Sequence, residues 1–298
     1  MWINTTEIEN TFAEAFVMWG ARVLVTGKDE KWAEVGAEAL TGFATSVIGC
    51  GCEAGIERAV KSDETPDGRP GVSCLLFARG REELGDQLVN RIGQAVMTAP
   101  TTACFDALEG DQRVPVGDKL RYFGDGFQIS KRIGDKRYWR IPVMEGEFVV
   151  EDKFSIQKGV GGGNFILLSE DPDTALTAAE KAVEAIGGMK NVIMPFPGGI
   201  VRSGSKVGAK YKSLGASTNT PFCPTIKGLV KTQLPDEVNT VYELVIDGLD
   251  IESVKGAMRL GIEQASTPGI KKITSGNYGG RLGKYMIALQ ELFGDADG

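Results

Sequence analysis

A pattern of strand, helix and strand occurs four times along the chain. In each copy an apolar run typical of a β-strand leads into an amphipathic helical segment and then into a second apolar run. The first strands are expected at residues 21–27, 72–78, 164–169 and 240–246, the helices at 31–40, 82–97, 174–186 and 251–265, and the second strands from 44, 101, 191 and 270. Two such units per half are typical of a split βαβ, or ferredoxin-like, sandwich. The pattern therefore predicts an α+β protein with two ferredoxin-like lobes, each with helices on one face of a mainly antiparallel sheet.

A doubly wound Rossmann sheet is the alternative interpretation. The long loop between the paired units of each half, and the lack of a nucleotide fingerprint after a first strand, favour the ferredoxin-like fold. The chain of 298 residues suits two domains of about 150 residues each. We place the boundary between residues 134 and 152 and predict lobes of residues 1–145 and 146–298. Asp173 and Asp250 are the predicted N-caps of the last two helices.

Histidine is absent from the sequence. This excludes Ser-His-Asp and Cys-His nucleophile systems and the common histidine metal sites. Acid and base chemistry must then use carboxylates, Lys, Tyr or Cys. The five cysteines are an odd number at uneven spacing, which indicates reduced thiols and not a disulfide framework.

The net charge of −7 and the pI near 5.0 argue against a nucleic-acid groove, because phosphate backbones need a broad basic surface. The sequence has no apolar run of the roughly 20 residues that would span a bilayer. It also lacks a basic segment followed by an apolar one at its N-terminus, so no secretory signal is indicated. We therefore expect a cytoplasmic protein with neither nucleic-acid nor membrane partners.

Residues 195–211, PFPGGIVRSGSKVGAKY, interrupt the pattern of helices and strands with glycines, hydroxyl groups and cations. Glycines allow the backbone N–H groups to turn toward a ligand, and the cations can meet negative charge at the same place. The candidate ligands of this stretch are Gly198, Gly199, Arg202, Ser203, Ser205, Lys206, Lys210 and Tyr211. They predict a site for an anionic ligand, with a solvated glycine-rich loop as the alternative.

The segment GIVRSGSK nearly matches the phosphate-binding motif GxxxxGK[ST], but Ser205 precedes Lys206 and does not follow it. In the true motif the lysine reaches the phosphates and the next hydroxyl holds magnesium, so the reversed order argues against nucleotide hydrolysis. The following segment, residues 204–231, is long and irregular. Such loops inside compact domains are usually functional or mobile.

Glu243 lies inside the apolar strand TVYELVI. Strand alternation places it on the same face as Val241 and Val245. If that face points inward, loss of solvent raises the pKa of the carboxyl group and makes it a usable acid near neutral pH. The alternative is an edge strand with Glu243 in water.

Four other loops are rich in Thr, Pro, Gly and Asn: residues 64–71, 98–102, 217–220 and 275–280. They offer hydroxyl, amide or backbone donors beside turns, although each one alone is also typical of ordinary turn chemistry. Thr101, Asn219 and Asn277 are the candidate binding residues that we take from them.

Many ordered stretches of the chain resemble the formylmethanofuran:tetrahydromethanopterin formyltransferase family. They are NTFAEAF, TGFATSVI, EAGIER, ETPDGRPGV, TAPTTACFDA, YFGDGF, IPVMEGEF, GGNF, PFPGGIVRSGSKVGAKY, ASTN, VYELVIDGLD and SGNYGGRLGKY. The sequence departs from the family pattern at Gly51 and Cys52, which stand where a proline and an alanine are expected, and in a polar extension at residues 294–298.

The resemblance implies reversible transfer of a formyl group between the amine of methanofuran and a pterin ring nitrogen of tetrahydromethanopterin. It implies no metal or prosthetic group, because both coenzymes act as substrates. It also implies two ferredoxin-like lobes and a homo-oligomer, commonly a tetramer, whose active clefts lie at subunit interfaces. In some bacteria such a chain is similar to a subunit of a formyltransferase/hydrolase complex, so a non-catalytic scaffold subunit is the alternative. The direction, toward methanogenesis or toward formaldehyde oxidation, stays open.

The resemblance also implies roles for particular residues. Glu243 aligns with a buried glutamate of the family and is assigned the proton transfer. Backbone N–H groups at Gly198 and Gly199 are the expected donors to the tetrahedral oxyanion. The cations of the glycine-rich stretch are expected to bind the carboxylate or phosphate tails of the coenzymes; they are Arg202, Lys206 and Lys210.

Overall fold

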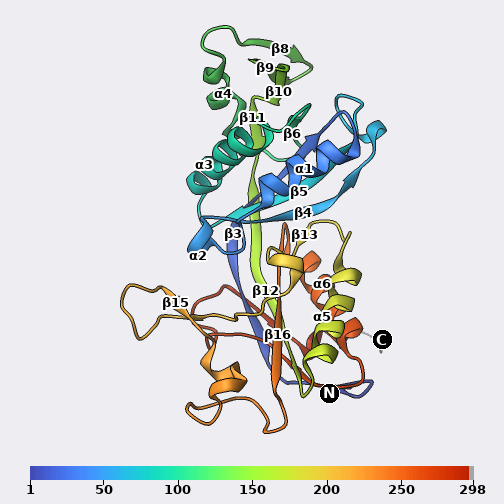
Figure 1. Cartoon of the computed structure of the whole chain (residues 1–298), viewed down its shortest axis with the longest axis vertical. Helices are drawn as coiled ribbons and strands as arrows, with labels where there is room; N and C mark the ends of the chain where they lie inside the picture. The colour runs from blue at the N-terminus through green and yellow to red at the C-terminus, as the bar shows by residue number, and fades with distance from the viewer. Residues whose placement is uncertain (295–298) are drawn as a thin grey trace. The chain divides into compact units, whose positions relative to one another are not determined.

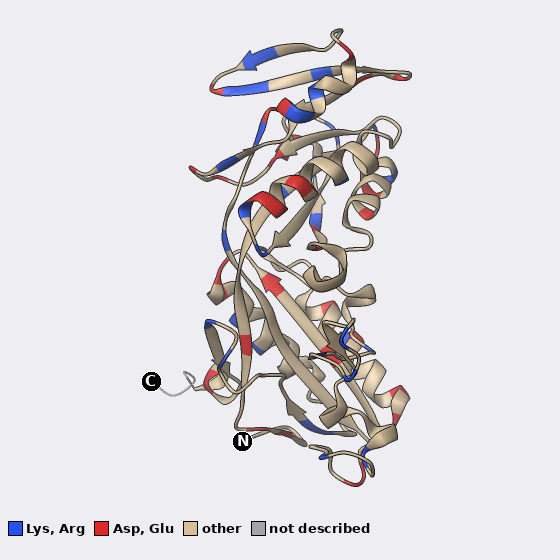
Figure 2. Ribbon diagram, turned by 90° about the vertical axis from the view of Figure 1, so that its left-hand side faces the viewer, with Lys and Arg blue, Asp and Glu red and all other residues tan. Residues whose placement is uncertain are grey.

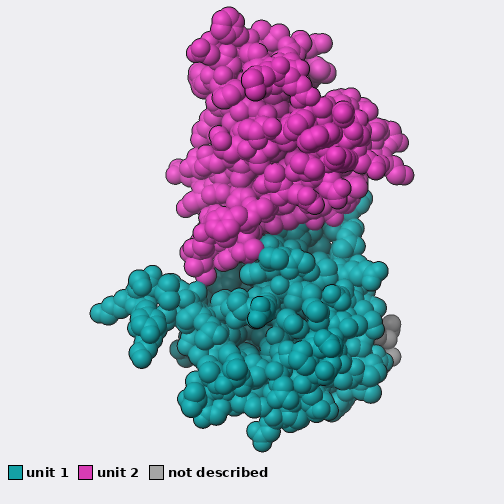
Figure 3. All heavy atoms as spheres, in the orientation of Figure 1, with its two compact units in different colours: residues 1–17, 160–298 teal, residues 18–159 magenta. Residues whose placement is uncertain are grey.

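The computed structural model describes residues 1–294 and consists of two compact units. Unit 1 combines residues 1–17 with residues 160–298, and unit 2 contains residues 18–159 (Figure 3). The polar extension that the sequence suggests after residue 294 lies outside the described residues.

The two units divide the chain differently from the predicted lobes of residues 1–145 and 146–298. The physical reason is that two long strands belong to both units. Strand β3 (Phe12–Thr26) passes from unit 1 into unit 2, and strand β12 (Gln157–Ser169) passes back. Connections made by continuous strands leave no composition change that a sequence can reveal.

Unit 2 contains the first two strand, helix and strand units that the sequence predicts (Figure 1). Its helices are α1 (Glu30–Thr41), α2 (Val47–Cys50), α3 (Arg81–Arg91) with a π-helical turn at Ile92–Val96, and α4 (Gly117–Leu120). Its further strands are β4 (Glu53–Val60), β5 (Gly71–Ala78), β6 (Ala103–Asp106), β7 (Arg113–Pro115), β8 (Ile129–Ile133), β9 (Lys136–Val143), β10 (Gly146–Glu151) and β11 (Lys153–Ser155).

The strands of unit 2 form a ferredoxin-like sheet in the order β4, β5, β3, β6, with every neighbouring pair antiparallel. The sheet continues through β10, which is parallel to β6, to the antiparallel strands β9 and β8. Helices α1 and α3 bury side chains such as Ala37, Leu40 and Leu88 against this sheet. The predicted ferredoxin-like fold is confirmed for this unit.

One predicted strand of unit 2 is wrong. Residues 44–50 do not form a strand, because Ser46 caps the short helix α2 and Gly51 follows it with a φ of 76°. The strand that pairs with β5 is instead β4, which begins at Glu53. An N-cap serine before a helix and a glycine in the left-handed region after it are ordinary helix ends, but the apolar residues between them also suit a strand.

Unit 1 contains the last two strand, helix and strand units together with the N-terminal strands. Its helices are α5 (Pro172–Ile186) and α6 (Ile251–Ala265), which lie side by side in Figure 1. Its strands besides β3 and β12 are β1 (Trp2–Ile3), β2 (Thr6–Ile8), β13 (Val192–Ile193), β14 (Lys206–Val207), β15 (Ala216–Ser217), β16 (Thr240–Gly248), β17 (Ile270–Thr274) and β18 (Tyr285–Ala288).

The sheet of unit 1 has the order β13, β16, β12, β17, again with every neighbouring pair antiparallel. This is the same ferredoxin-like order as in unit 2, so the prediction of two such folds is confirmed. Strand β2 extends the sheet in parallel to β17, and β18 pairs with the start of β3. The short β14–β15 hairpin projects from the body of unit 1 (Figures 1 and 3).

The two faces of the unit 1 sheet have different coverings. Helices α5 and α6 cover one face, where Phe165 and Leu244 are fully buried. On the other face Ile166 and Leu168 pack against Leu234, which belongs to the long segment between β15 and β16. Because a loop segment with two short 3-10 turns, and not an α-helix, covers this second face, polar side chains from loops can reach the sheet there.

Both predicted N-caps lie in unit 1, and one of them is wrong. Asp250 caps α6 as predicted, since its carboxylate accepts a hydrogen bond from the Ser253 N–H at 2.7 Å. The cap of α5 is Asp171 and not Asp173, because Pro172 occupies the first helical position and Asp171 accepts from the Thr174 N–H at 2.7 Å. Proline is favoured at the first helical position, and the N-cap is the residue directly before it, which here is Asp171.

Lys and Arg residues are interspersed with Asp and Glu residues in both units (Figure 2). Some pair within one element, as Arg259 and Glu263 do on α6. Among the described residues no helix combines the length and the apolar composition needed to cross a membrane.

Candidate active site

Glu243 lies on β16, on the face of the unit 1 sheet that the helices do not cover. Ile166 of β12 is its direct partner on one side. On the other side the glycine-rich stretch completes the pairing, because the Val201 N–H donates to the Glu243 carbonyl at 2.7 Å and the Glu243 N–H donates to the Val201 carbonyl at 3.1 Å. Glu243 therefore does not lie on an open edge, and the alternative of a strand edge in water is wrong.

The Glu243 side chain lines a cavity of about 80 Å³ together with Val241, as the strand alternation predicts. The side chain keeps some exposure to solvent. Protein surrounds the carboxyl group closely enough, however, that burial raises its pKa to about 7. A carboxyl group with this pKa can hold a proton and release it near neutral pH. The predicted rise is thus confirmed.

The cavity brings together residues that are far apart in the sequence. Arg202 and Ser203 from the glycine-rich stretch line it, and Asn219 lines it from the loop after β15. Gly204 has a φ of 57°, and a Cβ at this position would lie 3.1 Å from the Asn219 Cβ. Glycine at 204 therefore permits the close approach of the two loops that form the cavity wall.

Lys206 lies next to this cavity without lining it. Its Nζ donates to the Thr220 hydroxyl at 3.2 Å, one residue after Asn219. Ser205 is exposed, and Lys210 and Tyr211 are exposed in the loop that joins β14 to β15. The structure therefore separates the predicted anion-binding stretch into a part beside Glu243 and a part on the projecting hairpin.

Gly198 and Gly199 do not line the Glu243 cavity. They belong to a 3-10 turn (Pro197–Gly199) in which the Gly199 N–H donates to the Phe196 carbonyl at 2.8 Å. Gly199 has a φ of 75°, and a Cβ there would lie 2.8 Å from Val183 of α5. The N–H of Gly199, an expected oxyanion donor, thus has a partner inside the turn.

Asn277 uses its side chain to hold the start of β3. Its amide nitrogen donates to the Thr11 hydroxyl at 3.3 Å and to the Phe12 carbonyl at 3.1 Å. Its amide oxygen accepts from the Gly279 N–H at 3.1 Å. These bonds give the side chain a structural function within unit 1.

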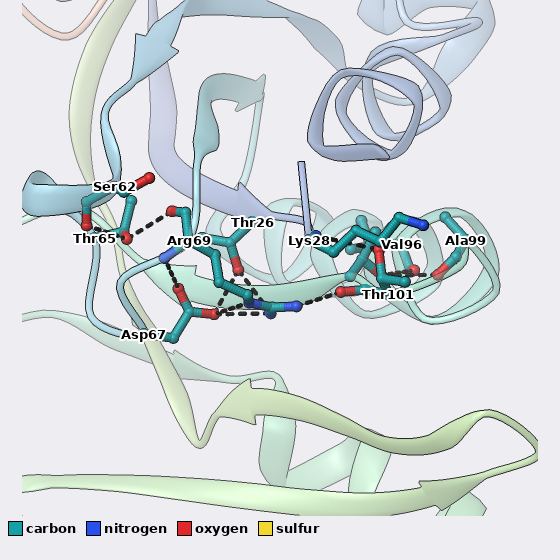
Figure 4. Close-up of polar contacts among 10 residues, drawn as sticks. Thr26, Lys28, Ser62, Thr65, Asp67, Arg69, Val96, Ala99 and Thr101 are labelled. Atoms are coloured by element: carbon teal, nitrogen blue, oxygen red, sulfur yellow. Dashed lines mark hydrogen bonds and ion pairs between the residues drawn. The ribbon is translucent and has the colours of Figure 1, made fainter. Parts of the chain in front are cut away.

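Thr101 lies in unit 2, where Figure 4 shows its contacts with Arg69 and Lys28. Its φ of 65° is in the left-handed region, which is unusual for a β-branched residue. Three neighbours hold it: Glu145 accepts from its N–H at 2.7 Å, Arg69 donates to its carbonyl at 2.5 Å, and the Lys28 N–H donates to its hydroxyl at 3.2 Å. The candidate loops 64–71 and 98–102 are therefore bound to each other through the side chain of Arg69.

Arg69 also binds Asp67 at 2.8 Å and the Thr26 hydroxyl at 3.0 Å (Figure 4). A cavity of about 330 Å³ adjoins this cluster. Polar residues on its wall include Asp67, Thr101 and Glu145.

Sequence reasoning missed Glu14, Asn164 and Tyr278. Glu14 is almost completely buried in β3, and Asn164 is buried in β12. The pKa of Tyr278 is raised by burial and then by the charge of Glu243, which indicates that the two side chains are neighbours. The signal for Glu14 was available, because it is a carboxylate in an apolar strand, as Glu243 is.

The structure describes no group of three or more His, Cys, Asp or Glu side chains that could hold a metal ion in residues 1–294. Fold and site together define an α+β protein with two ferredoxin-like folds and a carboxyl group of near-neutral pKa in a cavity of one of them. Two family models match the chain along nearly its whole length. The model for formylmethanofuran-tetrahydromethanopterin formyltransferase matches residues 1–143, and the model for the proximal lobe of the same family matches residues 146–292. The chain belongs to the formylmethanofuran-tetrahydromethanopterin formyltransferase family.

Individual relatives agree with the family models over full length. The formyltransferase of Methylococcus capsulatus is 57% identical over 296 residues, which cover 98% of this chain and 99% of that protein. The solved structure of the Methanosarcina barkeri enzyme is 52% identical with a TM-score of 0.92, covering 98% of this chain and 100% of that one. A chain in the formyltransferase/hydrolase complex of Methylorubrum extorquens, solved with methylofuran, is 48% identical with a TM-score of 0.95 and covers 98% of both chains.

Proposed function

We propose that this protein transfers a formyl group reversibly between formylmethanofuran and tetrahydromethanopterin, or a close pterin analogue. Relatives named formylmethanofuran–tetrahydromethanopterin formyltransferase match 98% of this chain. Both coenzymes act as substrates in a ternary complex, so that the formyl group passes directly from one nitrogen to the other. The observation that carries the proposal is Glu243, whose pKa is raised to about 7 by burial beside a polar cavity.

A formamide is stabilised by resonance, so its transfer needs a stabilised tetrahedral oxyanion and a proton for the departing amine. We assign the proton transfer to Glu243. With a pKa of about 7 the carboxyl group is populated in both forms at neutral pH. It can therefore protonate the leaving amine in one direction and accept the proton in the other, as a reversible transfer requires.

The coenzyme tails carry carboxylates, and the archaeal pterin tail also carries a phosphate. We assign their binding first to Arg202, which lines the Glu243 cavity, and then to Lys206 beside it. Ser203 and Asn219 offer hydrogen bonds in the same cavity. Cations next to a small polar cavity suit an anionic tail attached to a neutral reacting group.

Two other candidate residues, Lys210 and Tyr211, fit this proposal only with a second copy of the chain. Lys210 and Tyr211 lie on the projecting hairpin and away from the cavity of their own unit. We propose that they reach a coenzyme in a homo-oligomer, for which a tetramer is our expectation. Ser205 and Thr101 stay proposed substrate contacts.

An alternative is that the chain is a non-catalytic scaffold subunit. One structural relative comes from a formyltransferase/hydrolase complex, so membership of a complex and activity can coexist. The Glu243 cavity favours the active enzyme.

We include in the proposal a cytoplasmic location and one-carbon metabolism, either in methanogenesis or in formaldehyde oxidation.

The test is a formyl-transfer assay on the isolated chain with both coenzymes. Glu243→Gln keeps the shape of the side chain and removes its acid, so turnover should fall by about 10² or more. Glu180→Gln changes an exposed carboxylate on α5 and serves as the matched control with normal turnover. Near-normal turnover of Glu243→Gln would remove Glu243 from the mechanism. Formyl transfer that appears only with hydrolase subunits and is unaffected by Glu243→Gln would favour the scaffold alternative.

A further inference from the structure

Glu14 binds four backbone N–H groups of one loop, although it is separated from that loop by more than 260 positions in the sequence. Its Oε2 accepts from Tyr278 at 2.7 Å and from Gly280 at 2.9 Å. Its Oε1 accepts from Leu282 and Gly283, each at 2.5 Å. Burial opposes the charge of this carboxyl group, but the four N–H donors outweigh it and lower its pKa. Glu14 is therefore a buried anion whose charge is satisfied by the loop.

The close approach of this loop to Glu14 needs glycine at position 283. A Cβ there would lie 2.6 Å from the Ala15 carbonyl oxygen and 2.7 Å from the Glu14 Cγ. Gly279 and Gly280, with φ of 71° and 70°, turn the chain so that successive N–H groups face the carboxylate. The loop of residues 275–283, SGNYGGRLG, thus surrounds the Glu14 carboxylate with backbone N–H donors.

The other end of the loop is fixed beside Glu243. The Asn164 side chain accepts from the Gly276 N–H at 2.7 Å and donates to the Gly276 carbonyl at 3.2 Å. A Cβ at position 276 would lie 3.8 Å from Oε1 of Glu243. The backbone of the loop therefore passes directly next to the Glu243 carboxyl group.

Tyr278 lies between these two anchored points. Glu14 holds its N–H, and its ring lies 6.3 Å from the ring of Phe16, centroid to centroid. Burial, followed by the charges of Glu243 and Glu14, raises the pKa of Tyr278. The phenol is therefore protonated at neutral pH and can donate a hydrogen bond. Among residues 1–294 the structure shows no acceptor for its hydroxyl group.

Formyl transfer needs a hydrogen-bond donor for the oxygen of the tetrahedral intermediate. The Gly199 N–H, which the sequence suggested, is bound to Phe196. We propose that the loop of residues 276–283 forms a second wall of the Glu243 site, that the Tyr278 hydroxyl donates to the formyl oxygen, and that Glu14 positions this wall. The inference rests on the proposed formyl transfer and adds to it a catalytic residue and a positioning residue.

The first test compares Tyr278→Phe with Tyr285→Phe in the formyl-transfer assay. Tyr278→Phe keeps the ring and removes the hydroxyl, so kcat should fall by about 10², while KM for each coenzyme changes by less than about threefold, as expected for a donor that acts in the transition state. Tyr285 is a partly buried tyrosine on β18 and should tolerate the same change. A kcat of Tyr278→Phe within about twofold of wild type would overturn the assignment of the hydroxyl.

The second test is a double-mutant cycle between Glu14→Gln and Tyr278→Phe. If Glu14 acts through Tyr278, Glu14→Gln lowers the kcat of the wild-type protein but lowers it no further in Tyr278→Phe. Asp250→Ala removes the cap of α6 and is the control for lost stability, with kcat of the folded enzyme unchanged. Additive losses in kcat would overturn the positioning role of Glu14. Where Glu14→Gln does not fold, Glu14→Asp replaces it, because it keeps the charge.

These results also separate the inference from the proposed function. A wild-type chain that transfers no formyl group would overturn the proposed function. An active wild type with an unaffected Tyr278→Phe would overturn only the inference.

Discussion

At neutral and higher pH the substitution Glu243→Gln is expected to stabilise the folded protein. The same substitution should lower formyl-transfer activity. Burial raises the pKa of Glu243 from its ordinary value of 4.5 to about 7. Below pH 4.5 the carboxyl group is protonated in both the folded and the unfolded state, so its burial does not lower the free energy of unfolding through ionisation. As the pH rises from 4.5 to 7 the unfolded state ionises first, and the free energy of unfolding falls.

The size of this loss follows from the difference between the two pKa values. A difference of about 2.5 pH units, at about 1.4 kcal/mol for each, gives about 3 kcal/mol of lost stability above pH 7. The side chain retains some solvent exposure, so this figure is an upper limit. A neutral amide at position 243 avoids the loss, because it does not ionise.

Thermal unfolding of the two proteins at pH 5.5 and pH 8 tests this reasoning. At pH 5.5 the glutamine variant should exceed the wild type by about 1 kcal/mol, and at pH 8 by up to about 3 kcal/mol. The second difference corresponds to a rise in Tm of up to about 5 °C for a protein of this size. Glu180→Gln should show no such pH-dependent gain. An equal stability of Glu243→Gln and wild type at pH 8 would refute a buried carboxyl group with a raised pKa.

Two further changes test local features of unit 1. Asp171→Ala should lower the free energy of unfolding by about 1 kcal/mol through loss of the α5 cap, whereas Asp173→Ala should have a smaller effect; equal effects in urea unfolding would contradict the assigned cap. Gly199→Ala should destabilise by about 1–3 kcal/mol, because its methyl group meets Val183 at 2.8 Å and φ is positive. Gly198→Ala meets no atom within 4 Å and should cost less, so a reversed order would contradict the packing.

The sequence predicts both ferredoxin-like folds because their helices and strands have regular periodicity. It also predicts the face of Glu243, since alternation along β16 is strict. At residues 44–50, where the predicted strand is wrong, the apolar pattern does not distinguish a helix from a strand. The apolar residues suit a short helix as well as a strand, and the caps at Ser46 and Gly51 decide between them.

The site itself is less predictable because it is made by contacts between distant segments. Val201 pairs with Glu243, which lies 42 residues further along the chain. Glu14 binds Tyr278 from 264 residues away. Glycine-rich composition identified the stretch that contains Arg202, but it did not distinguish Gly199, whose N–H closes a turn, from Gly204, which approaches Asn219.

The alternation of β16 also affects how this protein can be redesigned. Leu244 is fully buried on the helix-covered face, and its neighbour Glu243 lines the cavity on the other face. Removing or adding one residue within the strand would exchange the two faces, placing a carboxylate in the core and a leucine in the cavity. The irregular segment before the strand, residues 218–239, has no such alternation. Changes of length in that segment are therefore the natural way to alter substrate preference while the position of the acid stays fixed.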